Sequence, residues 1–250
     1  NLITLDTASV YGNSEKLIGD YLQKNKNKKF NLTSKISSDA ESLTKQFLNS
    51  LQNMKTKKVH SVLFHSIELY NHFQNEINSF VNKFKGNGFE ELGVSLYSNK
   101  DILSIVDNKN IDRVQVPFNL LDNASKRKAL FLKLKSKSKK IDTRSTFLQG
   151  LFFKPLSEIP VYFKPIENQL LFLQNLSKDF QISMESIALS YVLQKDYVDS
   201  VLIGVDSLDQ LKKNLSFINE VIPKELVNKI DSINVETEDI INPSLWPKFL

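Results

Sequence analysis

The alternation of two residue patterns along the chain is the feature that most constrains its fold. Short runs rich in Val, Ile, Leu and Phe recur, and the apolar residues between them follow helical spacing. The runs lie at Leu2–Leu5, Phe30–Ile36, Val59–Phe64, Leu92–Leu96, Arg113–Phe118, Lys140–Phe147 and Val201–Val205. Strands that alternate with helices predict βαβ units and a parallel sheet.

Helix-start signals and apolar stripes occupy the segments between these runs. Ser38-x-x-Glu41 has the form of a capping box, and we expect Ser98-x-x-Asp101 and Ser207-x-x-Gln210 each to open a helix. The stripes are Leu43, Phe47, Leu48, Leu51 and Met54; Phe73, Ile77, Phe80, Val81 and Phe84; and Leu208, Leu211, Leu215 and Ile218. We interpret these stripes as the core-facing sides of helices.

Seven strand–helix units are compatible with an open doubly wound sheet or with most of an eight-stranded barrel. The phosphate signature of the open sheet is absent, because Gly86-x-Gly88 lacks a third glycine and precedes a strand. There is no internal repeat beyond the strand–helix period, and no linker-like composition divides the 250 residues. We therefore expect one domain over residues 1–250.

Composition excludes several classes of function. The chain contains no Cys, which excludes disulfides and Cys-based metal sites, and its three His residues form no ligand cluster, so no metal is expected. No apolar run approaches the roughly 18 residues of a membrane span, and no signal segment opens the chain, so we expect a cytoplasmic protein without a membrane partner. The net charge is +5, but Lys24–Lys29 and Lys133–Lys140 lack interleaved aromatics. We interpret these runs as solvated helix ends, which predicts no nucleic-acid partner; an anionic ligand is the alternative.

Polar residues at the carboxyl ends of the expected strands indicate a shared site. In a βα barrel, functional residues lie at this end of the strands. In chain order these residues are Asp6, Lys35, His65, Ser95, Gln115 and Arg144. Singly, Asp6 could cap a helix, Lys35 could extend to solvent, and His65 could be a hydrogen-bonded core residue. Six polar side chains at successive strand ends favour a functional interpretation.

The residues around the first of these positions resemble a known family. Leu5–Glu15 reads L-D-T-A-S-V-Y-G-N-S-E, with Gly19 following, and is similar to the aldo-keto reductase signature D-T-A-x-x-Y-G-x-S-E. The resemblance continues in order through Thr33–Lys35, Leu63–His65, Leu92–Ser95, Val114–Asn119, Arg144–Gly150 and Ile203–Asn214. It implies an α/β fold of the TIM (β/α)8-barrel type. It also implies an NAD(P)H-dependent oxidoreductase that reduces an aldehyde, ketone or sugar carbonyl to the alcohol. The expected partner is therefore a small-molecule carbonyl substrate.

The resemblance carries four catalytic positions onto Asp6, Tyr11, Lys35 and His65. Carbonyl reduction needs a hydride, which the cofactor supplies, and a proton from a general acid. A tyrosine ordinarily titrates at about 10, and a nearby ammonium lowers the pKa of a phenol. Tyr11 is therefore the expected acid and Lys35 the cation that acts on it. Asp6 is expected to hold Lys35 in place, and His65 to orient the substrate oxygen.

The same resemblance implies a set of cofactor-binding residues. They are Ser95 and Gln115 at the nicotinamide, Ser145, Phe147 and Gln149 at the pyrophosphate, and Gly204, Ser207, Gln210 and Asn214 towards the adenosine. A phosphate near the start of the last helix is physically favourable. The cations that commonly bind the 2′-phosphate are not in place, because Gly204, Asp206 and Gln210 occupy that stretch. We expect NADPH from the habit of the family, with NADH as the alternative.

Two departures from the family pattern bear on function. Arg144 replaces the aromatic residue that usually stacks on the nicotinamide; its guanidinium can stack there or can reach an anionic substrate. The R-S-x-F-L-Q-G motif at this point resembles a distinct branch of the family. The chain begins at Asn1, inside the second strand of the family barrel. We therefore expect the N-terminal hairpin and the first barrel strand to be missing and the sequence to be a fragment of a longer gene product.

These departures leave an alternative function open, namely a catalytically weak aldo-keto reductase-like binding or regulatory subunit. The sequence does not fix the substrate or the oligomeric state. The segments Leu151–Pro165 and Ile240–Leu250 are expected to shape the mouth of the barrel. Their aromatics either line a partly apolar pocket or pack on the rim; they are Phe152, Phe153, Tyr162, Phe163, Trp246 and Phe249.

Overall fold

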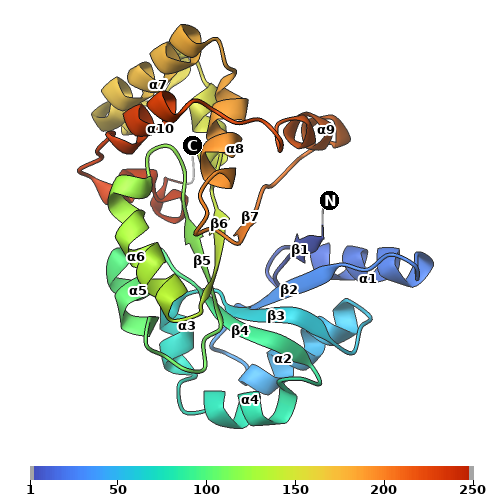
Figure 1. The fold of residues 1–250 in the computed structure, drawn as a ribbon. Coiled ribbons are helices and arrows are strands. Elements are labelled where there is room, and N and C mark those ends of the chain that lie inside the picture. Colours follow the sequence, from blue (N-terminus) through green and yellow to red (C-terminus); the bar gives the residue numbers. More distant parts are fainter. Residues whose placement is uncertain (1–2, 248–250) are drawn as a thin grey trace. The chain divides into compact units, whose positions relative to one another are not determined.

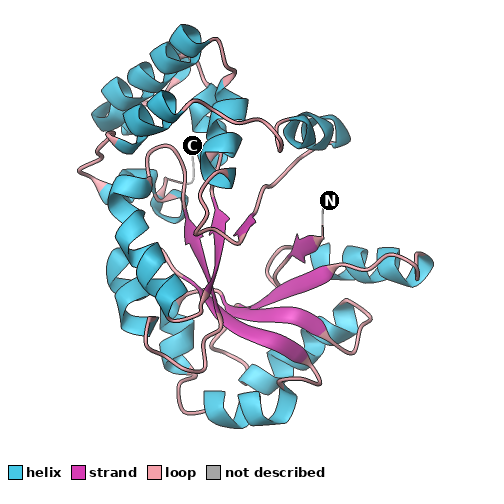
Figure 2. Ribbon diagram, viewed as in Figure 1, coloured by secondary structure: helices cyan, strands magenta, loops and turns pink. Residues whose placement is uncertain are grey.

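The computed structural model describes residues 3–247, in which strands and helices alternate along the chain (Figure 2). The strands are β1 (Thr4–Asp6), β2 (Asn31–Ile36), β3 (Val59–Phe64), β4 (Phe89–Ser95), β5 (Arg113–Pro117), β6 (Lys140–Arg144) and β7 (Ser200–Val201). Their order in the sheet is the order of the chain, from β1 to β7. The paired strands are parallel, as the alternating pattern predicts.

The chain divides into two compact units. The first unit comprises Asn1–Gln115 with Lys137–Lys140, and the second comprises Val116–Ser136 with Ile141–Leu250. β5 runs through the point of division. The single domain expected from composition stays a prediction, and each unit is described below by itself.

The helices follow the segments in which helical spacing was found (Figure 1). Those of the first unit are α1 (Ser14–Lys24), α2 (Leu43–Asn53), α3 (Ile67–His72), α4 (Ile77–Phe84) and α5 (Asn99–Ile105). Those of the second unit are α6 (Ala124–Ser136), α7 (Glu167–Phe180), α8 (Met184–Leu193), α9 (Leu208–Ser216) and α10 (Lys224–Asp231). Short 3₁₀ turns lie at Leu148–Phe153, Leu156–Glu158, Val161–Ile166, Glu238–Ile241 and Pro243–Leu245. Among the described residues, no helix is both long and apolar enough to span a bilayer.

An aromatic cluster lies between α2, α4 and β4 of the first unit, elements that Figure 1 labels, and contributes buried side chains to its core. Phe47 of α2 lies with its ring centroid 5.3 Å from that of Phe80 and 5.1 Å from that of Phe84, both on α4. It also lies 5.7 Å from Phe89 of β4, and all three contacts are edge-to-face. Such arrangements are favourable beyond the area that they bury, so Phe47 joins two helices to the sheet.

The backbone of α1 lies very close to the backbone at the carboxyl end of α2. A Cβ atom on Gly19 of α1 would lie 2.6 Å from the carbonyl oxygen of Asn53. Only glycine allows this approach, which explains the glycine that follows the first motif.

Two of the three helix-start signals are confirmed. The Ser98 side chain accepts from the Asp101 N–H, and the Asp101 carboxylate accepts from the Ser98 N–H, which makes a complete capping box. The Ser207 hydroxyl accepts from the Gln210 N–H at 3.1 Å and starts α9. The Gln210 side chain accepts from the N–H of Asp206, the residue before this N-cap, at 2.8 Å.

The capping box expected at Ser38 is wrong, because the helix begins four residues later. The N-cap of α2 is Ser42, whose hydroxyl accepts from the Lys45 N–H. The Gln46 side chain donates to the carbonyl oxygens of Ser38 and Glu41 at 2.7 and 2.9 Å. These bonds hold the preceding residues in a loop and prevent them from joining the helix.

Only some residues of the apolar stripes are buried in the core. The Phe73–Phe84 stripe is divided between two helices, since Phe73 is the C-cap of α3 and α4 begins at Ile77. Leu48 is exposed, because on a helix it lies about 100° around the axis from its buried neighbour Phe47. Leu208 and Ile218 are exposed too, whereas the buried residue of α9 is the polar Asn214. Asn214 of α9 is therefore turned inward, and Leu211 and Leu215 are half-buried.

Two strands end earlier than the apolar runs suggested. β6 stops at Arg144 and does not continue to Phe147, because Ser145 adopts a left-handed conformation with φ of 61°. β7 contains only Ser200–Val201. The first run is observed as Thr4–Asp6, and its Leu2 lies outside the described residues.

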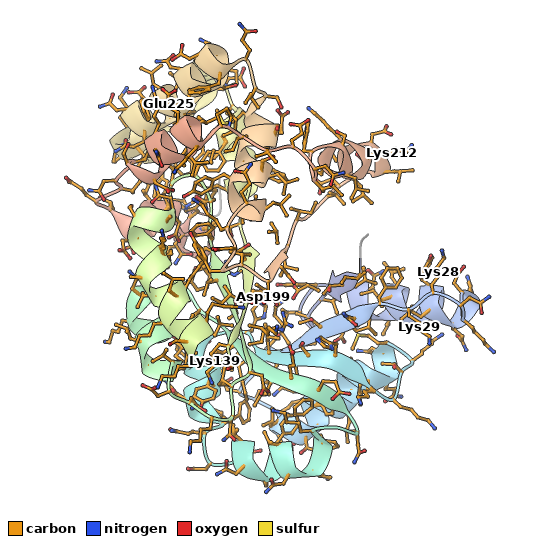
Figure 3. The ribbon with its side chains drawn as sticks, in the orientation of Figure 1. Lys28, Lys29, Lys139, Asp199, Lys212 and Glu225 are labelled. Carbon is orange, nitrogen blue, oxygen red and sulfur yellow. The ribbon has the colours of Figure 1, made fainter. Side chains whose placement is uncertain are left out.

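The lysine runs are solvated with one exception. Lys28 and Lys29 are exposed in the loop between α1 and β2, as expected of the first run (Figure 3). Lys139 of the second run is buried instead, and its ammonium donates to the carbonyl oxygens of Asn108 and Ile111. Burial lowers the pKa of Lys139, against the opposing charge of Asp112. The interpretation of this residue as solvated is therefore wrong.

Replacing Phe47 by Ala tests the aromatic cluster. Phe47 is 1% exposed, so Phe47→Ala should lower the free energy of unfolding by about 3–5 kcal/mol, which urea denaturation followed by circular dichroism measures. Leu48→Ala is the matched control, because Leu48 is adjacent on the same helix but 47% exposed, and it should cost under about 1 kcal/mol. Equal losses would contradict this description of the core.

Candidate active site

The four residues expected to be catalytic all lie in the first unit. Asp6 ends β1, Tyr11 lies in the turn before α1, Lys35 lies near the end of β2, and His65 directly follows β3. β1, β2 and β3 are parallel neighbours, so their carboxyl ends meet at one edge of the sheet. The structure brings the four side chains together at that edge.

A buried ion pair lies at the base of this cluster. Lys35 is 2% exposed, and its ammonium donates to Oδ1 of Asp6 and, at 3.3 Å, to the carbonyl oxygen of Thr7. Oδ2 of Asp6 accepts from the Gln115 side chain at 2.8 Å. Both carboxylate oxygens are therefore engaged, and the buried ammonium has the paired charge that a buried cation requires.

Tyr11 lies above this pair with its hydroxyl at the edge of the site. The Lys35 ammonium is 5.0 Å from the centroid of the Tyr11 ring, and the Tyr11 hydroxyl is 3.4 Å from Nε2 of His65. The two rings are edge-to-face, with centroids 5.6 Å apart. The Tyr11 ring therefore lies between the buried ammonium of Lys35 and the imidazole of His65.

Two more expected residues, Ser95 and Gln115, and one that was not expected, Ser37, lie at the same edge of the sheet. Ser95 is buried at the end of β4, and Gln115 lies in β5, where its amide already donates to Asp6. Contact of these two with a nicotinamide stays a prediction. The sequence analysis missed Ser37, whose hydroxyl lies 2.9 Å from Nδ1 of His65. Its position two residues after Lys35, just past the end of β2, is the signal that could have indicated it.

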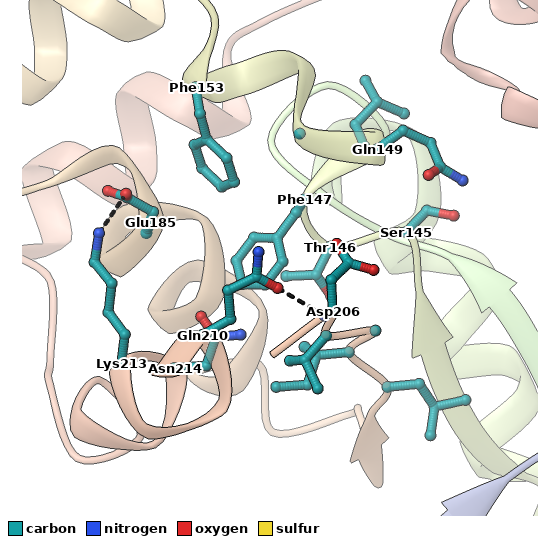
Figure 4. Close-up of a pocket in the computed structure, with 16 residues that line it drawn as sticks. Ser145, Thr146, Phe147, Gln149, Phe153, Glu185, Asp206, Gln210, Lys213 and Asn214 are labelled. Atoms are coloured by element: carbon teal, nitrogen blue, oxygen red, sulfur yellow. Dashed lines mark hydrogen bonds and ion pairs between the residues drawn. The ribbon is translucent and has the colours of Figure 1, made fainter. Parts of the chain in front are cut away.

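The second unit contains a cavity of about 710 Å³, within the range of small-molecule sites (Figure 4). Six of the expected cofactor-binding residues line it: Ser145, Phe147, Gln149, Gly204, Gln210 and Asn214. Ser207 is the N-cap of α9, and Arg144 ends β6 directly before the cavity wall. Neither is among the described residues that line the cavity.

One wall of this cavity is a strained segment. Ser145, Leu148, Gln149 and Gly150 have φ of 61°, 44°, 54° and 79°. Left-handed backbone costs non-glycine residues about 1 kcal/mol or more, and such residues cluster at functional sites. The Thr146 hydroxyl in this wall is buried and has no hydrogen-bond partner among the described residues. A ligand with polar groups would satisfy it.

The opposite side of the cavity contains charged groups. Lys213 of α9 donates to the carboxylate of Glu185 on α8 at 2.7 Å (Figure 4). Burial raises the pKa of Glu185, but the hydrogen bond and the charge of Lys213, with bonds from the backbone and Ser183, outweigh this and hold the pKa below its usual value. Glu185 is therefore ionised near neutral pH and compensates the charge of Lys213. The sequence analysis missed both Glu185 and Thr146, which no motif marks.

A smaller cavity of about 380 Å³ also lies in the second unit. It is lined by Gln149, Leu151, Lys154, Pro160, Phe163, Pro243, Trp246 and Pro247. The rings of Phe163 and Trp246 are edge-to-face, with centroids 4.7 Å apart. Of the aromatics expected at the mouth, these two line a pocket, Phe153 lines the larger cavity and Phe152 is buried. Phe249 lies outside the described residues.

Comparison with known proteins identifies the family. The profile of the aldo/keto reductase family matches residues 1–235. The chain belongs to the aldo/keto reductase family. No curated protein sequence gives a significant match.

Solved structures of other aldo/keto reductases share the fold. Aldo-keto reductase AKR11C1 from Bacillus halodurans superposes with a TM-score of 0.73 at 21% identity, over 94% of this chain and 84% of that one. An aldo/keto reductase from Klebsiella pneumoniae, solved with NADP and acetate, gives 0.67 at 17% identity, over 92% and 79%. The expected α/β fold of the TIM-barrel type is confirmed, and the seven described strands fit a barrel of this type that lacks one strand.

The buried ion pair of this aldo/keto reductase gives a stability prediction. Asp6→Asn leaves the Lys35 ammonium buried without its counter-charge and should lower the free energy of unfolding by about 3 kcal/mol in urea denaturation. Asp20→Asn removes the partner of Lys55 in an exposed pair and should leave stability nearly unchanged. Equal effects of the two variants would show that the Asp6–Lys35 pair is not a structural requirement.

Proposed function

We propose that this aldo/keto reductase is an NAD(P)H-dependent carbonyl reductase, in which Tyr11 is the general acid. The substrate class is an aldehyde, a ketone or a sugar carbonyl. The observation that carries the proposal is the position of Tyr11, which lies over the Lys35 ammonium and within 3.4 Å of His65.

The geometry divides the reaction among these side chains. NAD(P)H, when bound, would supply the hydride for the carbonyl carbon. The Tyr11 O–H bond breaks, its proton goes to the carbonyl oxygen, and the electron pair stays on the phenol oxygen. The Lys35 ammonium stabilises that charge, and the carboxylate of Asp6 holds Lys35 in place. The substrate thus gains a hydride and a proton and becomes the alcohol.

The larger cavity of the second unit fits the phosphate-bearing part of such a cofactor. The amino end of α9 favours an anion, and the buried Thr146 hydroxyl lacks a partner among the described residues. Ser145, Phe147 and Gln149 would hold the pyrophosphate, and Gln210 and Asn214 the adenosine. The NADP complex of the Klebsiella pneumoniae enzyme supports this assignment.

Removing the Tyr11 hydroxyl tests the proposed acid. Tyr11→Phe should lower kcat for carbonyl reduction by about 100-fold or more, because general acid catalysis is lost, and should leave cofactor affinity unchanged. NAD(P)H oxidation with a panel of carbonyl compounds measures the first, and fluorescence titration the second. Tyr21→Phe is the matched control, since both tyrosines are 46% exposed, and it should retain full activity.

Two other outcomes would redirect the proposal. Near wild-type reduction by Tyr11→Phe would show that the assigned mechanism is wrong. Saturable cofactor binding by the wild-type protein without reduction of any carbonyl would favour the alternative, a binding or regulatory member of the family.

The proposed cofactor is NADPH, with NADH as the alternative, and the Glu185–Lys213 pair bears on the choice. Lys213 lies on the cavity wall, but Glu185 already compensates its charge. Glu185→Gln removes the competing carboxylate and leaves Lys213 free to attract a 2′-phosphate. The variant should gain about three- to tenfold in affinity for NADPH relative to NADH in fluorescence titrations.

Glu225→Gln is the control for this experiment. Glu225, which Figure 3 labels on α10, pairs with Lys229 of the same helix, and no described residue of α10 lines the cavity. The variant makes the same change in net charge and should leave the ratio of affinities unchanged. An equal shift in both variants would assign the effect to net charge alone.

A further inference from the structure

Tyr11 lies in a short loop whose tip has little packing to hold it. The loop runs from Thr7, directly after β1, to Ser14, the first residue of α1. The residues from Ser9 to Asn13 are all exposed, and a Cβ atom on Gly12 would meet nothing beyond its chain neighbours within 4 Å. Burial of apolar surface therefore does not fix the position of Tyr11, and this task falls to hydrogen bonds.

Two backbone hydrogen bonds shape the loop around Tyr11. The Tyr11 N–H donates to the carbonyl oxygen of Ala8 at 3.0 Å, and the Tyr11 carbonyl oxygen accepts from the Ser14 N–H at 3.1 Å. Each bond closes a four-residue turn, so two successive turns share Tyr11. Gly12, in the second turn, has φ of 59°, a left-handed conformation that glycine adopts without steric cost. The shape of the loop is thus local, whereas its placement beside Lys35 requires an attachment to the sheet.

Thr7 provides this attachment through three separate groups. Its N–H donates to the carbonyl oxygen of Thr33 in β2 at 2.8 Å, and its carbonyl oxygen accepts from the Lys35 ammonium at 3.3 Å. Its hydroxyl donates to the Ser14 hydroxyl at 2.9 Å, which closes the base of the loop. Thr7 is 0% exposed, so water does not replace the partner of its hydroxyl.

Glu15 anchors the far end of the loop. Its buried carboxylate accepts from the Ser34 hydroxyl at 2.7 Å and from the Asn53 side-chain amide at 3.0 Å. These bonds fix the start of α1 against β2 and α2. The Thr7–Ser14 bond then joins this fixed helix start to the residue whose carbonyl group contacts Lys35.

We propose that Thr7 is a positioning residue, whose hydroxyl closes the loop at Ser14 and thereby holds Tyr11 beside the Lys35 ammonium. The same residue contacts the cation and the segment that bears the proposed acid, so it resists displacement of one relative to the other. The effect on catalysis rests on the proposed function, whereas the closure of the loop does not depend on it.

Hydrogen exchange measured by NMR tests the closure of the loop without any activity. Thr7→Val keeps the shape of the side chain and both backbone bonds of residue 7, and removes the bond to Ser14. The Tyr11 and Ser14 amides should exchange about fivefold faster, the equivalent of one neutral hydrogen bond. The Lys28 amide, which donates to the Asn25 carbonyl oxygen in another turn, should keep its exchange rate.

Kinetics test the consequence for Tyr11. Thr7→Val should lower kcat for carbonyl reduction about fivefold, with KM and cofactor affinity unchanged, because only the placement of the acid changes. Thr7→Ser keeps the hydroxyl and should restore both kcat and the exchange rates.

Thr56→Val is the matched control for both measurements. The Thr56 hydroxyl donates to the Lys58 carbonyl oxygen at 2.9 Å in the turn before β3, at the opposite end of the sheet from the site. The variant loses a hydrogen bond of the same kind and should leave kcat and the exchange of the Tyr11 amide unchanged.

A double variant shows whether the effect acts through the Thr7–Ser14 bond. Ser14→Ala removes the other partner and should lower kcat to the same degree as Thr7→Val. Because both variants break one bond, their combination should cause no further loss. Effects on kcat that multiply would show that the two side chains act separately, and the proposal would be overturned.

The remaining outcomes separate this proposal from the proposed function. Unchanged exchange of the Tyr11 and Ser14 amides in Thr7→Val would overturn the proposal whatever the activity. An unchanged kcat in Thr7→Val, measured against an active wild-type protein, would overturn it as well. If exchange accelerates as expected but the wild-type protein reduces no carbonyl, the proposed function fails, and with it the placement of an acid, while the closure of the loop by Thr7 stands.

Discussion

The buried ammonium of Lys35 is the constraint on which the geometry of the first unit depends. Moving a cation out of water costs several kcal/mol, and only a counter-charge and hydrogen bonds offset that cost. Asp6 supplies the charge and Thr7 a carbonyl oxygen, while Gln115 engages the second oxygen of Asp6. One charge thus ties together the carboxyl ends of three strands. β1 has only three residues, so this pair also anchors a strand that has few ladder bonds of its own.

The order and type of the elements could be predicted because they rest on local pattern. Apolar runs and helical spacing predict the parallel strands and the helices between them, and the helix start expected at Ser98 is where α5 begins. The failures arise from interactions with distant atoms. The Gln46 side chain competes for the carbonyl groups before α2 and moves the helix start to Ser42. Lys139 is buried because its ammonium donates hydrogen bonds to backbone carbonyl groups of another loop. The lysine-rich sequence around it gives no sign of these partners.

The candidate site divides in the same way. Asp6, Tyr11, Lys35 and His65 are readable because strand ends and a motif mark them, and the structure places them in mutual contact. The partners that orient them are not marked. Ser37 matters only because its hydroxyl meets one nitrogen of one ring, and Glu185 only because it lies opposite Lys213, 28 residues along the chain. Each of these contacts depends on how two elements pack against each other. Neither the spacing of residues in the sequence nor their type predicts this packing.

Departures from local rules gather around the proposed cofactor cavity. Its wall contains consecutive left-handed residues at Leu148 and Gln149, an unsatisfied hydroxyl at Thr146, and α9 with a polar residue turned inward. Each lowers the stability of the free protein, and natural sequences keep such features where a function needs them. The electrostatics differ between the two sites. The charge of Lys35 lies beside the ring of Tyr11, the acid that we propose, whereas Glu185 compensates the cation Lys213 at the cavity wall. The first site therefore holds one buried ion pair beside the proposed acid, whereas the cavity wall holds Lys213 with its charge already compensated by Glu185.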